Sequence, residues 1–142
     1  MSYPDYEVIV ADDGSADGTR EAVKEFGRIR YYRQEKKGIS AAKNLGIGKS
    51  RGDILVFTDD DCRAEPDWLS RLTNCLDSEK VGAVGGPDIA HRDDSLLAKC
   101  VDYAVTSFIG TGGVRRKGKR IGKYYPRSFN MAVPAKVIEQ VG

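Results

Sequence analysis

Short apolar runs alternate with helix-length segments over residues 1–87 of this 142-residue chain. Each run holds four or five mostly β-branched or apolar residues, which is typical of a buried strand. The segments between the runs carry apolar residues at roughly helical spacing. The expected strands cover residues 7–11, 29–33, 54–58 and 81–84, and the expected helices cover residues 19–26, 39–49 and 66–76. This alternation predicts a parallel sheet in an α/β layered fold.

The pattern weakens after Pro87. Residues 96–108 favour a helix, residues 130–133 a strand, and a last helix is expected from Pro134. Residues 110–122 contain five glycines and five basic residues, a composition typical of a mobile loop. The second part of the chain is therefore less strongly specified than the first.

Two acidic loops follow expected strands, Asp12-Asp13 after the first strand and Asp59-Asp60-Asp61 after the third. Ligands of parallel α/β sheets bind beyond the carboxyl ends of the strands. Three consecutive carboxylates repel one another unless a positive group binds, and a divalent cation that also bridges to a diphosphate is the simplest one. Asp59 and Asp61 project to the same side of an extended chain, so one can hold metal while the other contacts ribose or metal-bound water. A solvated turn or helix cap is the alternative.

Other metal sites fit the sequence poorly. Residues 13–18 imitate the first half of an EF-hand loop, but the twelfth position is Lys24 instead of a bidentate Glu, and a strand precedes the loop. Three cysteines and a single histidine have no zinc-site spacing, and we expect reduced, mostly buried thiols. The expected metal is therefore a hard cation held by oxygen, Mg²⁺ or Mn²⁺.

The net charge of +2 gives no strong global field, so any attraction for anions must come from local clusters. Seven basic residues lie between Arg115 and Arg127, with Tyr124 and Tyr125 among them. This stretch is interpreted as a solvated loop, a nucleic-acid or anionic-membrane patch, or a loop that draws in an anionic acceptor. The longest apolar runs are too short to cross a bilayer and the N-terminus is not a signal peptide. A cytoplasmic location, with or without peripheral contact to a membrane, is expected.

Seven segments of the chain form a further pattern: residues 3–10 (YPDYEVIV), 12–19 (DDGSADGT), 38–46 (GISAAKNLG), 52–54 (GDI), 57–61 (FTDDD), 65–69 (EPDWL) and 130–133 (NMAV). Together they resemble glycosyltransferase family 2, and FTDDD resembles that family's DXD motif. Each segment is modest alone, but their order and spacing are specific, and the resemblance covers essentially the whole chain.

The resemblance implies a GT-A fold, a three-layer Rossmann-like architecture with a mostly parallel sheet, that binds a nucleoside diphosphate sugar with Mg²⁺ or Mn²⁺. Residues 1–87 would form its nucleotide-binding half and residues 88–142 the start of its acceptor half. The expected reaction is transfer of a sugar with inversion to a glycan or lipid-phosphate acceptor. A UDP-sugar is the favoured donor. Nucleic acid is not an expected partner.

Site residues follow from the same resemblance. Asp12 and Asp13 would contact the base and ribose, and Asp59 and Asp61 would hold the metal and diphosphate, with Asp60 between them. Lys43 stands where the family usually has Arg, and it lacks the bidentate fork of Arg. The expected substrate-binding residues are Asp12, Asp13, Lys43, Asp59, Asp60 and Asn130, and the expected metal ligands are Asp59 and Asp61.

The sequence also departs from the family pattern. The family normally begins with a strand and helix that precede this chain's first strand, and that strand usually lies between the strands of residues 7–11 and 54–58. We therefore expect a rearranged sheet or a strand-exchanged homo-oligomer. The catalytic base is expected beyond Gly142; Asp88, Asp93 and Asp94 are nominal substitutes for which surface placement is favoured. The alternative function is a non-catalytic nucleotide- or anion-binding module of the same fold.

Overall fold

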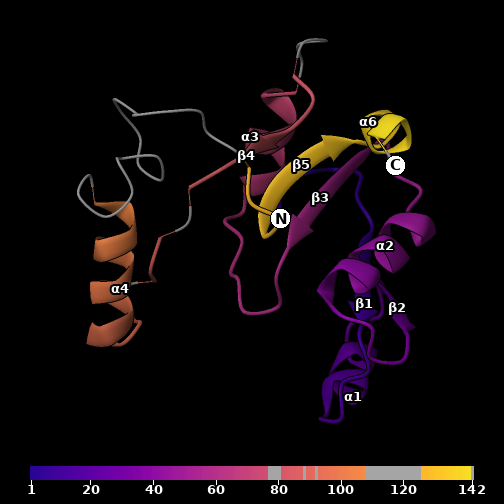
Figure 1. Cartoon of the computed structure of the whole chain (residues 1–142), viewed down its shortest axis with the longest axis horizontal. Helices are drawn as coiled ribbons and strands as arrows, with labels where there is room; N and C mark the ends of the chain where they lie inside the picture. The colour runs from indigo at the N-terminus through magenta and orange to yellow at the C-terminus, as the bar shows by residue number, and fades with distance from the viewer. Residues whose placement is uncertain (77–80, 88, 92, 108–125, 142) are drawn as a thin grey trace. The chain divides into compact units, whose positions relative to one another are not determined.

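The computed structural model describes residues 1–76, 81–87, 89–91, 93–107 and 126–141. These residues form two compact units: unit 1 holds residue 1 and residues 56–133, and unit 2 holds residues 2–55 and 134–142. The predicted alternation of strands and helices is confirmed. The elements in chain order are β1 (Val8–Asp12), α1 (Thr19–Lys24), β2 (Ile29–Arg33), α2 (Ile39–Lys49), β3 (Ile54–Thr58), α3 (Trp68–Asn74), β4 (Val84–Gly85), α4 (Leu96–Thr106), β5 (Asn130–Pro134) and α6 (Ala135–Val141) (Figure 1).

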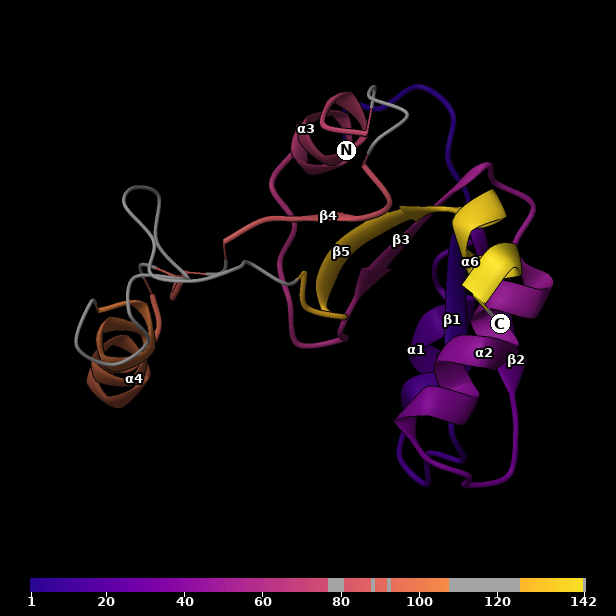
Figure 2. The same ribbon diagram turned by 45° about the horizontal axis from the view of Figure 1, so that its top comes forward.

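Unit 2 is built on the parallel pair β1 and β2, in which Val8 lies opposite Ile29 and Asp12 opposite Arg33. Parallel strands need a crossover, and α1 supplies it. Helix α2 contacts β1, and both views show it alongside the pair (Figure 2). Its residues Ala42 and Gly46 lie one turn apart on one face of the helix. A Cβ at Gly46 would stand 3.6 Å from that of Ala11, so the small residues let α2 approach the strand closely.

Unit 1 contains a three-stranded sheet in the order β3-β5-β4, with β5 in the centre. Strand β4 runs antiparallel to β5, with Val84 opposite Ala132. Ala132 and Val133 of β5 are buried, as are Leu69 and Leu72 of α3. The central strand and one face of α3 therefore supply the core of this unit.

The described strands form two sheets, because β1 pairs with β2 while β3 pairs with β5. The rearranged sheet that the sequence analysis expects remains a prediction. Strand exchange between copies remains a prediction.

Three details differ from the sequence-based expectations. Strand β4 covers only Val84–Gly85, because Gly82 weakens the preceding residues as a strand and Pro87 has no N–H to continue the pairing. All three cysteines are free thiols, but they are exposed, so the prediction of mostly buried thiols is wrong. Cys62 lies in an acidic loop, Cys75 directly follows α3, and Cys100 lies in α4, which has no buried residue. The third difference is that α3 begins at Trp68, two residues after Pro66, because a turn from Glu65 to Trp68 precedes it.

The described helices include none that is both long and apolar enough to cross a membrane. The predicted loop of residues 110–122 lies outside the described residues.

Replacing Gly14 by Ala should destabilise the fold by about 1–3 kcal/mol. Gly14 has φ of 82°, a region that L side chains rarely adopt, and an added Cβ would lie 3.0 Å from the backbone nitrogen of Lys36. Gly48→Ala in α2 is the matched control, because nothing lies within 4 Å and its φ is not positive. It should leave stability unchanged or raise it by about 0.5–1 kcal/mol. Urea unfolding of both variants checks this, and equal stability of the two variants would contradict it.

Candidate functional site

Asp12, the last residue of β1, is only 4% exposed and carries a buried, ionised carboxylate. Its Oδ1 accepts a 2.7 Å hydrogen bond from the backbone N–H of Ser15, and its Oδ2 accepts one from the Tyr31 hydroxyl. The Arg33 guanidinium lies 3.5 Å from Oδ2. The Tyr31 bond, together with the Ser15 bonds and the Arg33 charge, lowers the pKa of Asp12 to about 2. The carboxylate therefore organises the end of β1 around protein donors.

Asp13 ties the loop after β2 to the start of α2. Its Oδ1 accepts hydrogen bonds from Gln34 Nε2 at 2.6 Å and from the Lys37 N–H at 2.8 Å. Its Oδ2 accepts from the Gly38 N–H at 2.7 Å, one residue before α2. The Gln34 bond, followed by these backbone bonds, lowers the pKa of Asp13. Because Lys43 is on α2, Asp13 helps to place the helix that carries this half-buried lysine.

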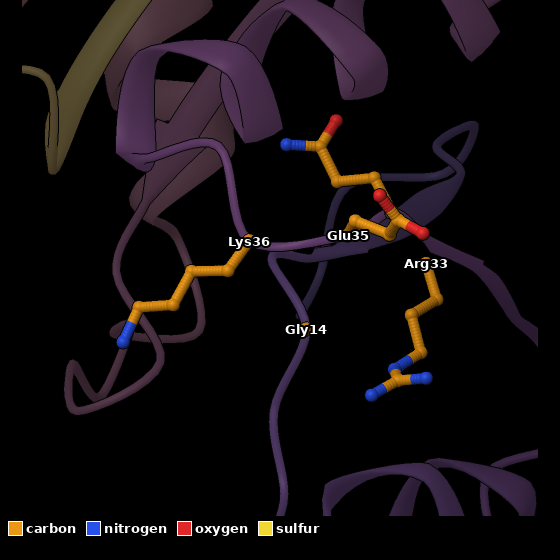
Figure 3. Close-up of a pocket in the computed structure, with 5 residues that line it drawn as sticks. Gly14, Arg33, Glu35 and Lys36 are labelled. Atoms are coloured by element: carbon orange, nitrogen blue, oxygen red, sulfur yellow. The ribbon is translucent and has the colours of Figure 1, made fainter.

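A shallow cavity of about 420 Å³ lies beside Asp13, at the carboxyl ends of β1 and β2. Its lining residues are Gly14, Arg33, Gln34, Glu35 and Lys36. The side chains of Arg33 and Lys36 extend on opposite sides of Gly14 (Figure 3). The guanidinium of Arg33 also donates to the carbonyl of Ser15 at 3.0 Å, so this cationic side chain of the cavity is fixed to the first acidic loop.

The sequence reasoning missed Arg33 and Lys36. The signal was present as the charged run RQEKK in residues 33–37, which begins at the last residue of β2. It carried no known motif, and its proximity to Asp12 and Asp13 arises only from the parallel pairing.

The second acidic loop, Asp59-Asp60-Asp61, follows β3 in unit 1. Asp59 is half-buried, whereas Asp60 and Asp61 are exposed. A turn begins here, because the Cys62 N–H donates to the carbonyl of Asp59 at 3.3 Å, and the Cys62 thiol lies 3.6 Å from Asp61 Oδ1. In the described part of the chain, no three Asp, Glu, His or Cys side chains are grouped closely enough to hold a metal ion by themselves.

Asn130, the first residue of β5, forms hydrogen bonds within unit 1 through both polar atoms of its side-chain amide. Its Oδ1 accepts a 2.9 Å hydrogen bond from the Trp68 indole, and its Nδ2 donates to the carbonyl of Pro87 at 3.1 Å. Its backbone carbonyl also accepts from the Gly86 N–H at 3.4 Å. Asn130 therefore joins β5 to the start of α3 and the end of β4.

The nominal base residues face a neighbouring histidine. Asp94 accepts a 2.7 Å hydrogen bond from the backbone N–H of His91, and the carboxylate of Asp93, 89% exposed, lies 3.3 Å from His91 Nδ1. Arg63 contacts the other ring nitrogen at 3.2 Å. Both aspartates thus have the surface placement that the sequence favours, while Asp88 lies outside the described residues.

Of the basic stretch between Arg115 and Arg127, the structure describes Arg127, whose guanidinium lies 6.0 Å from the centre of the Phe129 ring.

The sequence profile of Glycosyl transferase family 2 matches residues 1–137, nearly the whole chain. The chain belongs to this family. The match covers both acidic loops, Lys43 and Asn130, so these residues lie within a family 2 glycosyltransferase sequence.

Curated relatives of this glycosyltransferase chain agree with the assignment. Glycosyltransferase AglE of Haloferax volcanii is 39% identical over 150 aligned positions, which cover 100% of this chain and 47% of the relative. Glucosyl-dolichyl phosphate glucuronosyltransferase of the same organism is 30% identical over 100 positions, covering 65% of this chain and 32% of the relative. The chain thus spans about half the length of AglE, and less of the second relative.

A solved structure shows the same fold. The mannosyltransferase PcManGT from Pyrobaculum calidifontis, in complex with GDP-Man and Mn²⁺, matches 96% of this chain and 37% of its own chain, with a TM-score of 0.67 and 23% identity. The fold is therefore of the GT-A type, as the resemblance predicts.

Asp12→Asn should remove a component of acid sensitivity. The folded-state pKa of Asp12 is about 2, below the ordinary value of 3.8, so its stabilisation is present above pH 3.8 and is lost as the pH falls through about 2. The variant should lose about 1–2 kcal/mol near neutral pH and show a flatter stability profile on acidification. Tyr31→Phe, which keeps the carboxylate but removes its main donor, should shift the acid transition to higher pH. Urea unfolding from pH 2 to pH 6 measures both, and an unchanged profile for Asp12→Asn would contradict the assignment.

Proposed function

We propose that this chain is the donor-binding part of a metal-dependent glycosyltransferase that transfers a sugar from a nucleoside diphosphate to an acceptor with inversion. The observation that carries the proposal is the acidic loop Asp59-Asp60-Asp61, which follows a strand, exposes two of its carboxylates and lies within a family 2 sequence. Exposed carboxylates at the end of a strand are suited to a cation and a phosphorylated ligand.

Asp59 and Asp61 are the proposed metal ligands, and their hard oxygen donors suit Mg²⁺ or Mn²⁺. Mg²⁺ is commonly held by one or two carboxylates together with substrate phosphates, so this role needs no three-residue protein cage. Among the described residues, no three such side chains are grouped closely enough to form a cage, and a site of two carboxylates does not need one. Mn²⁺ in the mannosyltransferase structure supports a divalent ion. When bound, the ion would neutralise negative charge on the departing diphosphate.

Unit 2 carries the residues that we propose to contact the nucleoside of the donor. Asp12 and Asp13 frame the ends of β1 and β2, and we propose that they contact the base and ribose, directly or through the loops that they hold. Lys43 would meet a phosphate or base carbonyl as a single charge. A UDP-sugar is the donor that the sequence favours, and GDP is the necessary comparison because the solved neighbour contains GDP-Man.

Inverting transfer needs a carboxylate that takes the acceptor's proton as the acceptor oxygen attacks the anomeric carbon. We propose a glycan or lipid-phosphate acceptor, and the glucosyl-dolichyl phosphate in the name of one relative supports the lipid phosphate. Product formation from a sugar nucleotide separates a transferase from a module that only binds nucleotides.

A strand-exchanged homo-oligomer and the cytoplasmic location also remain predictions.

Asp61→Ala should weaken metal-dependent binding of a nucleoside diphosphate by more than about tenfold, because a lost ligand should cost at least as much as a lost outer-sphere partner of a metal site. Calorimetric titration with UDP and GDP, with Mn²⁺ and again with chelator, measures this. Asp93→Ala is the matched control, since Asp93 is an acidic residue with 89% side-chain exposure outside the proposed site. Equal binding by Asp61→Ala and the original chain, or no binding by the folded original chain, would overturn the proposal.

A further inference from the structure

The acidic segment, defined as residues 59–67, connects β3 to α3 and carries the proposed metal ligands. One end leaves β3, which pairs with β5. The other end enters α3 at Trp68, whose indole donates to Asn130 at the start of β5. Both ends of the segment are therefore attached to the same central strand.

Between these ends, residues 60–66 are exposed. The backbone bonds of the segment include two turn bonds, from Cys62 to Asp59 and from Trp68 to Glu65, and its side chains contact His91 through Arg63 and Arg71 through Asp67. Fixing both ends of a loop reduces the conformations that it can adopt. The two anchors limit where the carboxylates of Asp59 and Asp61 can lie, and the Trp68–Asn130 bond is the anchor that a single substitution can remove.

The anchor at Asn130 is specific to an asparagine. Its amide accepts from Trp68 with oxygen and donates to Pro87 with nitrogen, and an aspartate can supply only the acceptor. The amide also lies against backbone, because a Cβ at Gly86 would stand 3.0 Å from its Nδ2. Close packing against Gly86 limits rotation of the amide, so that its oxygen stays directed at Trp68 and its nitrogen at Pro87.

We infer that Asn130 is a positioning residue that orders the acidic segment through Trp68, rather than a residue that contacts the substrate. The inference rests on the proposed function, in which this segment binds metal and diphosphate. It adds the contact by which a strand 62 residues further along the chain sets the order of those ligands.

Trp68→Phe and Asn130→Ala test the inference, because each deletes the indole–amide bond from a different side. Within residues 60–66, hydrogen exchange at the Cys62 amide, which donates to the Asp59 carbonyl, should accelerate by about two- to tenfold in each variant, the range expected for one hydrogen bond. The double variant should show little further change, since both substitutions remove the same bond. Mn²⁺ affinity, measured by titration of the full chain, should fall by a similar factor.

Thr73→Val is the matched control. It removes a hydrogen bond inside α3, from the Thr73 hydroxyl to the carbonyl of Leu69, without touching Asn130. Exchange in residues 60–66 and Mn²⁺ affinity should stay at the original values in this variant. Unchanged exchange in Trp68→Phe, or effects of the two variants that simply add, would overturn the positioning role. Absence of Mn²⁺ binding by the original chain would instead overturn the metal site, while the exchange measurement would still decide whether Asn130 orders the segment.

Discussion

The buried carboxylate of Asp12 is the constraint on which the loops of unit 2 depend. A charge removed from water needs partners, and this one gathers the Ser15 N–H, the Tyr31 hydroxyl and the Arg33 guanidinium at the end of β1. Two of these partners come from β2, so the ion reinforces the parallel pairing at its carboxyl end. Asp13 then extends the same arrangement to the start of α2.

The two acidic loops look alike in the sequence but have different surroundings in the structure. The carboxylates of Asp12 and Asp13 are held by several donors from the protein, whereas Asp60 and Asp61 are exposed beside a simple turn. Carboxylates that already accept several hydrogen bonds form a stable, ionised frame. Exposed carboxylates can take up a cation with less loss of existing bonds. This contrast supports the proposal that the loop of unit 1 holds the metal.

Unit 1 depends on β5, which comes late in the chain and pairs on both sides. Its first residue, Asn130, connects β5 to α3 and β4, and its residues Ala132 and Val133 are buried. A resemblance between sequences can suggest that Asn130 belongs near the substrate. It cannot show that both ends of the amide are occupied by Trp68 and Pro87, because those partners are 62 and 43 residues away.

The sequence by itself determined the family, the alternating architecture and the ranges of β2, α2 and β3, which match the predicted residues. Apolar periodicity and the residues that end an element act between near neighbours, so they are visible in the order of the residues. The sequence also indicated the candidate acidic residues. Only the tertiary structure decided the pairing order, the short β4, the exposure of the cysteines and the protein partners of Asp12, Asp13 and Asn130. These depend on hydrogen bonds and packing between segments far apart in the chain, whose geometry no local pattern specifies.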